Sequence, residues 1–414
     1  MEKNFQIKQA LVLDGNVVFL FDSIEELSGC YLIQENNMYG ILSLDGVIIL
    51  KTEWDSIKET EHFFQVAKNN KNGILSKDGT VILQPEWDSI EEWDNFFLVK
   101  KDGKAGILSL DGSIIVNPEC DYVDAYEECF IVCKNGKEGI CGKDGSLILE
   151  AEWDQILDCA DCFIFRKDYK WGACSRNGSV VLKAEWDDII DMDSYLLVKK
   201  NYKYGVRYSN GSVILKTEWD AIDYHEDRFF VEKNSKYGIR AQDGSVILKA
   251  EWDDIQENEG YLFVSKNGKH GVFANDGTML LKTEWPNISY WKGFFLVFEG
   301  GLQGICSKDG TIILKPEWNH IFSFDGVYFK VRKFGLESIV SKDGTIILQP
   351  EWDSIIVCKN YFLVWKNWKQ GIVAKDGSVV LEAKWDRIVD NDSHFTCYLA
   401  GKEYTFAKDG TPIA

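Results

Sequence analysis

The chain has 414 residues, of which 45% are hydrophobic and only six are proline, a composition typical of a folded protein. Its formal net charge is -20 and only seven residues are arginine, so a nucleic acid is not an expected partner, because an acidic surface repels phosphates. The N-terminal residues lack the apolar core of a signal peptide, and no segment approaches the roughly 20 apolar residues of a membrane span. We therefore expect a cytoplasmic protein that does not bind membranes.

One short pattern returns along the whole chain. An Asp-Gly or Asn-Gly pair recurs every 33 residues, apart from a first step of 31 residues and one of 34. The glycines of this pair are Gly15, Gly46, Gly79, Gly112, Gly145, Gly178, Gly211, Gly244, Gly277, Gly310, Gly344, Gly377 and Gly410. A fixed period of this length is typical of propellers and solenoids. No interval is long enough to hold a linker, so we predict a single domain over residues 1–414.

Each repeat is predicted to form four short strands and no helix. In the repeat around Gly112, the apolar run 96–99 indicates a buried first strand, and a hairpin at 101–104 leads to a second strand over 106–110. The pair Asp111-Gly112 predicts a two-residue hairpin turn, because both residue types tolerate the positive φ that such a turn requires. A third strand follows over 113–116, and a fourth begins over 120–123. This unit resembles a short propeller blade.

The most regular motif is Glu-Trp-Asp-x-Ile, for example Glu53-Trp54-Asp55-Ser56-Ile57. Tryptophan occupies its position in ten of twelve copies. These residues are Trp54, Trp87, Trp153, Trp186, Trp219, Trp252, Trp285, Trp318, Trp352 and Trp385. We interpret them as the structural core of the repeats, because an indole buries up to about 250 Å² and fills the gap between blades. The alternative is a ladder of ligand-stacking indoles. The aspartate that follows is predicted to cap backbone N–H groups of a turn.

These residues resemble the bacterial WG (KWG) repeat proteins. The resemblance lies in Lys170-Trp171-Gly172, Lys203-Tyr204-Gly205 and Lys236-Tyr237-Gly238, each followed by a strand, an Asn-Gly or Asp-Gly pair, an aliphatic strand and an aromatic-Asp-x-Ile sequence. It covers essentially the whole chain, although Trp-Gly itself occurs only at Trp171-Gly172 and the glycine is replaced at Ser338. The resemblance implies a β-propeller-like array with binding or scaffolding roles and no common catalytic residues.

The number of blades and the closure of the array are less strongly specified. The chain contains thirteen copies of the first three predicted strands and twelve of the tryptophan strand. We favour a single continuous toroid, because the repeats show no interruption in mid-chain. Two six-bladed lobes and an open superhelix with capping end repeats are the alternatives. We expect a monomer.

The eleven cysteines are odd in number and absent from several repeats, which indicates reduced thiols rather than a disulfide framework. Cys159 and Cys162 form a lone C-x-x-C, and a zinc site would need two further ligands nearby. No metal or cofactor is therefore expected. The five histidines fall at different positions of different repeats, so no catalytic constellation is indicated and we predict that the protein is not an enzyme.

Binding residues are expected where the repeats differ. The segment that follows the tryptophan motif is acidic in most repeats, whereas the hairpin between the first two strands is rich in lysine, so we predict two faces of opposite charge that steer a partner. Simple solvation of these loops is the alternative. One sector instead places aromatic residues in this segment. We predict Tyr290, Trp291, Phe322 and Phe324 as anchors for a protein partner; the alternative is that they fill gaps in an irregular region.

Two functions remain open from the sequence. The first is a non-catalytic cytoplasmic scaffold that recognises a protein through its blade-connecting loops. The second is a lectin-like or other small-ligand binder that uses the Trp and Asp of each blade as a site. The exposure of Trp54, Trp87 and Trp252 distinguishes them, because a ligand-stacking indole must be open to solvent.

Overall fold

The computed structural model describes residues 9–13 and 16–413. These residues form strands and turns and no helix, so the described part of the chain holds no helical segment of the length and hydropathy that a membrane span needs. The chain divides into two compact units, Met1–Thr217 and Glu218–Ala414, and the boundary falls within one strand. The prediction of a single domain over residues 1–414 stays a prediction.

The strands of the first half of the chain are β1 (Gln9–Leu13), β2 (Asn16–Phe21), β3 (Ser23–Glu26), β4 (Cys30–Glu35), β5 (Met38–Ser43), β6 (Ile48–Trp54), β7 (Ser56–Glu59), β8 (Phe63–Lys68), β9 (Lys71–Ser76), β10 (Val81–Trp87), β11 (Ser89–Trp93), β12 (Phe96–Lys101), β13 (Lys104–Ser109), β14 (Ile114–Cys120), β15 (Tyr122–Ala125), β16 (Cys129–Lys134), β17 (Lys137–Gly142), β18 (Leu147–Trp153), β19 (Gln155–Asp158), β20 (Cys162–Lys167), β21 (Lys170–Ser175), β22 (Val180–Trp186), β23 (Asp188–Asp191), β24 (Tyr195–Lys200), β25 (Lys203–Tyr208) and β26 (Val213–Trp219).

Those of the second half are β27 (Ala221–His225), β28 (Arg228–Lys233), β29 (Lys236–Ala241), β30 (Val246–Trp252), β31 (Asp254–Asn258), β32 (Tyr261–Lys266), β33 (Lys269–Ala274), β34 (Met279–Trp285), β35 (Asn287–Trp291), β36 (Phe294–Glu299), β37 (Leu302–Cys306), β38 (Ile312–Trp318), β39 (His320–Phe324), β40 (Tyr328–Lys333), β41 (Leu336–Ser341), β42 (Ile346–Trp352), β43 (Ser354–Val357), β44 (Tyr361–Lys366), β45 (Lys369–Ala374), β46 (Val379–Trp385), β47 (Arg387–Asn391), β48 (His394–Leu399), β49 (Lys402–Ala407) and β50 (Pro412–Ile413).

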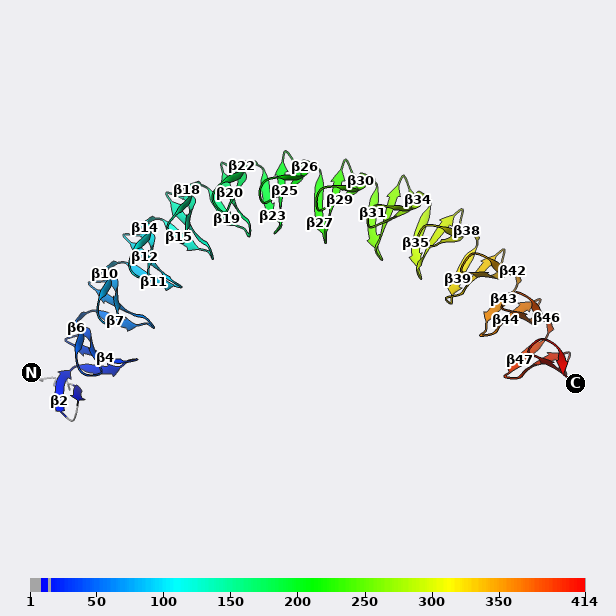
Figure 1. Ribbon diagram of the computed structural model, residues 1–414, viewed down its shortest axis with the longest axis horizontal. Helices are drawn as coiled ribbons and strands as arrows, with labels where there is room; N and C mark the ends of the chain where they lie inside the picture. The colour runs from blue at the N-terminus through cyan, green and yellow to red at the C-terminus, as the bar shows by residue number, and fades with distance from the viewer. Residues whose placement is uncertain (1–8, 14–15, 414) are drawn as a thin grey trace, which may run out of the picture. The chain divides into compact units, whose positions relative to one another are not determined.

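Consecutive strands pair into small antiparallel sheets. The described residues form twelve four-stranded sheets and one two-stranded sheet, β1-β2. Each four-stranded sheet is a meander of neighbours in the sequence, for example β11-β12-β13-β14. Figure 1 shows these sheets following one another in chain order within each unit. The predicted all-β array of propeller-like four-stranded blades is confirmed, whereas its closure into a toroid stays a prediction.

The boundary between blades differs from the predicted one. The predicted fourth strand over 120–123 is wrong, because β14 ends at Cys120 and Tyr122 begins β15, which belongs to the next sheet. Asp121 lies between the two strands, and its carboxylate accepts hydrogen bonds from the Gly136 amide at 3.0 Å and from Lys104 Nζ at 2.5 Å. The aspartate thus caps a turn amide, as predicted. The Glu-Trp-Asp-x-Ile motif is the crossing point from one blade to the next.

The glycine of the Lys-x-Gly motif is required by a close approach of two strands. In the pairing of β29 with β30, Tyr237 opposes Trp252 and Ile239 opposes Leu248, so β30 contains two extra residues at this point. A Cβ atom on Gly238 would lie 2.7 Å from the backbone nitrogen of Ala250. Ser338 is the exception that fits, because its buried hydroxyl donates a hydrogen bond of 2.5 Å to the Leu348 carbonyl.

The Asp-Gly pair forms a different turn from the predicted one. In the described pairs only the glycine has positive φ, as at Gly112 with φ of 87°, so the prediction of a two-residue turn with both residues in this region is wrong. The Gly112 amide donates to the Ser109 carbonyl at 3.0 Å, and the Ser109 amide donates to the Ser113 carbonyl at 2.9 Å. This is a type I turn closed by a glycine bulge. The true two-residue turns join the second and third strands of each sheet, as at Asp102 and Gly103 with φ of 51° and 76°.

The apolar core lies between successive sheets. Ile239, Leu248 and Trp252 of one sheet pack against Leu262 and Val264 of the next. Nine of the ten repeat tryptophans are at most 8% exposed, and Trp153 is half-buried. Where a fourth strand ends in tryptophan, the indole therefore fills the space between two blades, and its burial stabilises the array by roughly 4–6 kcal/mol on an area basis.

The close approach at Gly238 predicts the effect of a single methyl group. Gly238→Ala should lower the free energy of unfolding by about 1–3 kcal/mol, because the added Cβ meets backbone atoms that cannot rotate away. Chemical denaturation of the full chain measures this change. Adding Ala250→Gly should not restore stability, since the clash involves the backbone of residue 250. Full rescue by that second change would show that side-chain crowding is the cause.

The Asp-Gly turns predict a loss of stability in acid. Hydrogen bonds from the neighbouring Ser hydroxyl and from the Ser or Thr two residues on lower the pKa values of Asp78, Asp111 and Asp309 to about 2. A depressed pKa in the folded state stabilises the fold above the ordinary pKa of about 3.9, and this contribution disappears as the pH falls to about 2. The thermal midpoint of unfolding should therefore fall steeply between pH 4 and pH 2.

The triple variant Asp78→Asn, Asp111→Asn and Asp309→Asn should show a shallower fall over the same pH range. Asparagine fits this turn, because Asn177 Oδ1 accepts hydrogen bonds from Ser175 Oγ at 2.6 Å and from the Ser179 amide at 3.0 Å. An unchanged pH profile in the triple variant would contradict the assignment.

Candidate functional site

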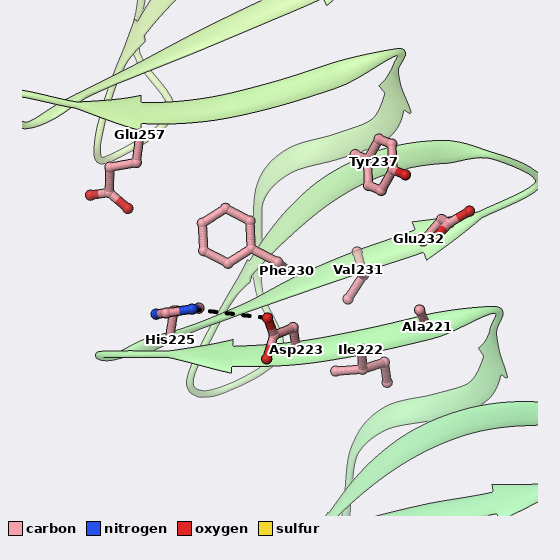
Figure 2. Close-up of a pocket in the computed structure, with 9 residues that line it drawn as sticks. All are labelled: Ala221, Ile222, Asp223, His225, Phe230, Val231, Glu232, Tyr237 and Glu257. Carbon is pink, nitrogen blue, oxygen red and sulfur yellow. Dashed lines mark ion pairs between the residues drawn. The ribbon is translucent and has the colours of Figure 1, made fainter.

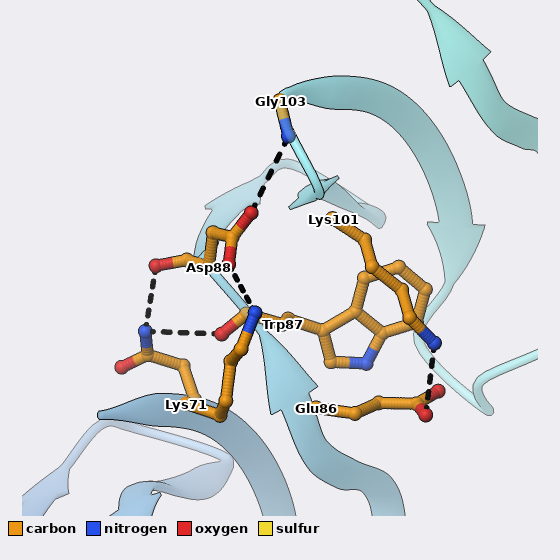
Figure 3. A network of polar contacts seen from close by, with 7 residues as sticks. Lys71, Glu86, Trp87, Asp88, Lys101 and Gly103 are labelled. Atoms are coloured by element: carbon orange, nitrogen blue, oxygen red, sulfur yellow. Dashed lines mark hydrogen bonds and ion pairs between the residues drawn. The ribbon is translucent and has the colours of Figure 1, made fainter. Parts of the chain in front are cut away.

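The buried indoles are closed off by ion pairs. In Figure 3, Lys101 lies over the ring of Trp87, with Nζ 5.6 Å from the ring centroid, and forms an ion pair of 2.9 Å with Glu86. The same three-residue arrangement occurs at Trp54, Trp153, Trp186, Trp219, Trp252, Trp318 and Trp352. A ligand that stacked on these rings would have to displace a lysine.

The next residue of the motif holds a second lysine. Figure 3 also shows Asp88, which pairs with Lys71 through one oxygen and accepts the Gly103 amide at 3.4 Å through the other. Equivalent pairs join Lys104 to Asp121, Lys137 to Asp154, Lys170 to Asp187, Lys236 to Asp253 and Lys369 to Asp386. Many lysines of the predicted basic face are therefore neutralised by neighbouring carboxylates. The positive electrostatic potential of this face is lower than its number of lysines suggests.

Open clefts lie beside the first strands of the sheets. Figure 2 shows one in the second unit, a cleft of about 510 Å³. It is lined by Asp223 on β27, Phe230 and Glu232 on β28, Tyr237 on β29 and Glu257 on β31 of the following sheet. His225 points along the same face, with Nε2 3.9 Å from Asp223 Oδ2. The cleft combines aromatic surface with several carboxylates.

Comparable clefts elsewhere carry different side chains. One of about 640 Å³ in the second unit is lined by Asp353, Ser354, Ile356, Trp365, Asn367 and Trp368. Another of about 420 Å³ in the first unit is lined by polar and apolar residues that include Lys58, Gln65, Glu91 and Glu92. At these clefts, alternate residues of the first strand and one residue of the second strand thus differ from blade to blade. The tryptophan that ends the fourth strand and fills the space between two blades, which we call the wedge tryptophan, does not change. The residues that line the clefts are therefore those in which the repeats differ from one another.

The predicted anchors do not lie in one patch. Tyr290 packs against the preceding sheet, with its ring centroid 5.6 Å from that of Tyr261. Trp291 packs on the opposite side of its own sheet, beside Phe294 and Leu296. Phe322 is 36% exposed. Phe324 ends β39, but its side chain lies outside the described residues. Their role in binding a partner stays a prediction.

Phe322 belongs to a charged cluster within its own sheet. The Arg332 guanidinium lies 4.6 Å from the Phe322 ring centroid and 2.9 Å from Glu337 Oε1. Lys330 Nζ lies 2.8 Å from Glu337 Oε2, which also accepts the Ile355 amide at 2.6 Å. The buried Glu337 thereby links two sheets. This cluster was not evident from the sequence, because its members come from three strands.

Four aromatic residues at hairpin tips were also missed. Tyr169, Tyr202, Phe334 and Trp368 are 85–93% exposed. All four have positive φ, between 51° and 65°, at hairpin-tip positions where other repeats place Asn, Asp, Ser, Gly or Ala. An aromatic residue in this region costs roughly 1–2 kcal/mol relative to glycine. The available signal was the replacement of a turn residue by an aromatic one at either of the two hairpin-tip positions of the repeat.

The cysteines are unpaired thiols, and most are buried. Burial raises the pKa of Cys129 to about 11 and that of Cys174 to about 12, which keeps both thiols protonated at neutral pH. Among the described residues, no group of three or more His, Cys, Asp or Glu side chains lies close enough together to hold a metal ion.

Truncation of a buried wedge tryptophan and of an exposed hairpin-tip tryptophan should change the stability by different amounts. Trp252→Ala should lower the free energy of unfolding by about 3–5 kcal/mol, because it leaves a cavity between two sheets. Trp368→Ala should change it by no more than about 0.5 kcal/mol, since the side chain is 93% exposed. Denaturant titration of both variants provides the comparison, and equal losses would contradict the wedge.

Comparison with known proteins identifies a repeat family for part of the chain. Five stretches match the family described as WG containing repeat, at residues 73–104, 106–137, 171–204, 209–237 and 242–269. The comparison with curated proteins gives no match.

Several solved structures match this chain at low sequence identity and low TM-score. PorZ, a surface component of the type-IX secretion system of Porphyromonas gingivalis, is 9% identical, with coverage of 97% of this chain and 73% of PorZ and a TM-score of 0.20. The extracellular domain of the putative one component system BT4673 from B. thetaiotaomicron is 9% identical, with coverage of 94% and 76% and a TM-score of 0.19. A eukaryotic initiation factor is 10% identical, with coverage of 70% and 96% and a TM-score of 0.23.

The family matches cover two consecutive repeats and then three more, with residues 138–170 unmatched between them. The remaining four-stranded sheets have the same strand order. In most of them a glycine faces the doubled residues of the fourth strand. Five stretches between residues 73 and 269 therefore match WG containing repeats, and the other four-stranded sheets share their strand order.

Proposed function

We propose that this protein is a non-catalytic binding scaffold that recognises a protein partner through the clefts and loops between its blades. The observation that carries the proposal is the contrast between two sets of positions. The wedge indoles recur and are buried, whereas the cleft positions occupied by Asp223 and Glu232 in one blade hold Ile356 and Trp365 in another. A surface that varies along a constant framework is suited to reading an extended partner.

The burial of the indoles weighs against the alternative of one ligand site per blade. Trp54, Trp87 and Trp252 are only 7–8% exposed, and each lies beneath a lysine. A sugar or other small ligand that stacks on an indole needs one open ring face. The aspartate of the motif is also engaged, since it caps a turn and in many blades pairs with a lysine.

A cytoplasmic location and a monomeric state belong to the same proposal. Support for the location comes from the cysteines, which are odd in number and mostly buried as thiols. The acidic charge of -20 supports a partner other than a nucleic acid. The absence of enzymatic activity is proposed on the lack of a recurring histidine or nucleophile position in the sequence.

A photo-crosslinking amino acid in place of Ile356 tests the proposal in native cells. Ile356 lies in a cleft and is 51% exposed, and Val379 in the same sheet is 59% exposed without lining that cleft. We expect Ile356 to form a discrete covalent adduct with another protein, identified by mass spectrometry, and Val379 to form none. Equal labelling from both positions, or adducts that contain no protein, would contradict a cleft-reading scaffold.

A further inference from the structure

The cleft beside Trp368 differs from its counterparts in charge. We infer that this cleft binds an arginine side chain from a basic segment of a partner protein, with the guanidinium stacked between Trp365 and Trp368 and paired with Asp353. The inference rests on the proposed function and specifies the chemistry of the partner. It is carried by a comparison of equivalent positions in different blades.

The first difference is a missing lysine. Asp154 and Asp187 are paired with Lys137 and Lys170, the first residues of β17 and β21. The residue at this place before Asp353 is Leu336, the first residue of β41. Asp353 still accepts the Asn367 amide at 2.6 Å, but no described lysine or arginine forms an ion pair with it. One carboxylate therefore faces the cleft without a counterion among the described residues.

The second difference is a missing cation on the neighbouring strand. The position of Trp365 is occupied by Arg166 in the blade of Tyr169 and by Lys199 in the blade of Tyr202. Arg166 lies 5.3 Å from the ring centroid of Trp171, and Lys199 lies 4.9 Å from that of Tyr204. In the Trp368 cleft both cation positions have become apolar. The nearby Lys366 pairs with Glu351 at 2.7 Å, and Lys369 pairs with Asp386.

The third observation is that Trp368 is exposed to solvent at a position of unfavourable backbone conformation. Its indole is 93% exposed at a turn residue with φ of 65°. The exposed ring gains no packing that would offset the backbone strain within the chain. Exposed aromatic residues beside a cleft of about 640 Å³ are the groups that anchor protein partners. The exposed position of Trp368 is thus better explained by binding of a partner than by stabilisation of the fold.

The chain itself shows that this chemistry works in its framework. Arg207 lies 5.1 Å from the Trp186 ring centroid, and Arg240 lies 4.9 Å from that of Trp219. Lys366 lies over Trp352 and reaches a carboxylate in the same way. A guanidinium stacks on indoles and pairs with carboxylates better than other side chains do. The Trp368 cleft presents the indoles and the carboxylate and lacks the cation.

Charge complementarity specifies the partner further. The chain carries a net charge of -20, so a basic segment is attracted over a distance before it docks, whereas an acidic segment is repelled. The cleft itself offers aromatic surface and one carboxylate. An arginine in a basic, extended peptide meets both requirements, and a neutral peptide or an oligosaccharide uses only the aromatic surface.

The test measures binding of a fluorescein-labelled glycine peptide that contains two arginines to the full chain by fluorescence anisotropy. We expect Trp368→Ala and Asp353→Asn each to raise the Kd by about tenfold. Leu336→Lys should do the same, because it supplies the lysine that other blades use to neutralise the aspartate. Tyr169→Ala is the matched control, since Asp154 beside it is already paired, and it should leave the Kd unchanged. Each variant is checked for an unchanged thermal midpoint.

The same peptide with citrulline in place of arginine should bind about tenfold more weakly, because it keeps the shape and loses the charge. Equal binding of the citrulline peptide, or preferential binding of a proline-rich peptide or an oligosaccharide, would overturn the arginine assignment. If the arginine peptide fails while position 356 still crosslinks to a protein, this inference fails and the scaffold stands. If both fail, the proposed function fails too.

Discussion

The structure depends on the burial of an indole between most pairs of successive sheets, and at the end of β14 its place is taken by the buried Cys120. A four-stranded sheet of this size has two faces that must be covered, and the tryptophan at the end of the fourth strand covers the place where the next sheet begins. Burying it contributes roughly 4–6 kcal/mol per blade on an area basis. The lysine above the ring and the glutamate beside the indole close the outer side, as Figure 3 shows for Trp87.

The other constant residues of the repeat serve that arrangement. The glycine facing the doubled residues of the fourth strand allows the backbone approach that brings the indole inward, and Ser338 shows that a small hydroxyl can replace it when it donates to the opposing carbonyl. The glycine of the Asp-Gly turn lies against the previous blade, since a Cβ atom on Gly112 would be 2.7 Å from the Ile82 carbonyl. The residues that repeat are therefore those that hold blades together. Variation is left to the clefts and the hairpin tips.

The sequence was sufficient for the period, the four strands of a blade and the aspartate cap, because these follow from local turn chemistry and a repeated pattern. It placed the blade boundary wrongly, since Trp54 and Ile57 look like one strand until the backbone turns at Asp55. The type of turn at Asp111-Gly112 was also wrong, because the side chain of Ser109 and the glycine bulge decide it and neither shows in a two-residue signal. The clefts were not predicted at all, because their lining residues are distant in the sequence and alternate along strands.

The central claim is that the wedge indoles are shielded and that recognition is left to the exposed ones. Exchange of indole N–H protons in protein labelled with ¹⁵N-tryptophan tests it directly. The account predicts slow exchange for wedge indoles such as Trp252 and Trp318, which are 7% and 2% exposed, and fast exchange for Trp368 at 93%. Fast exchange from all indoles alike would contradict the account.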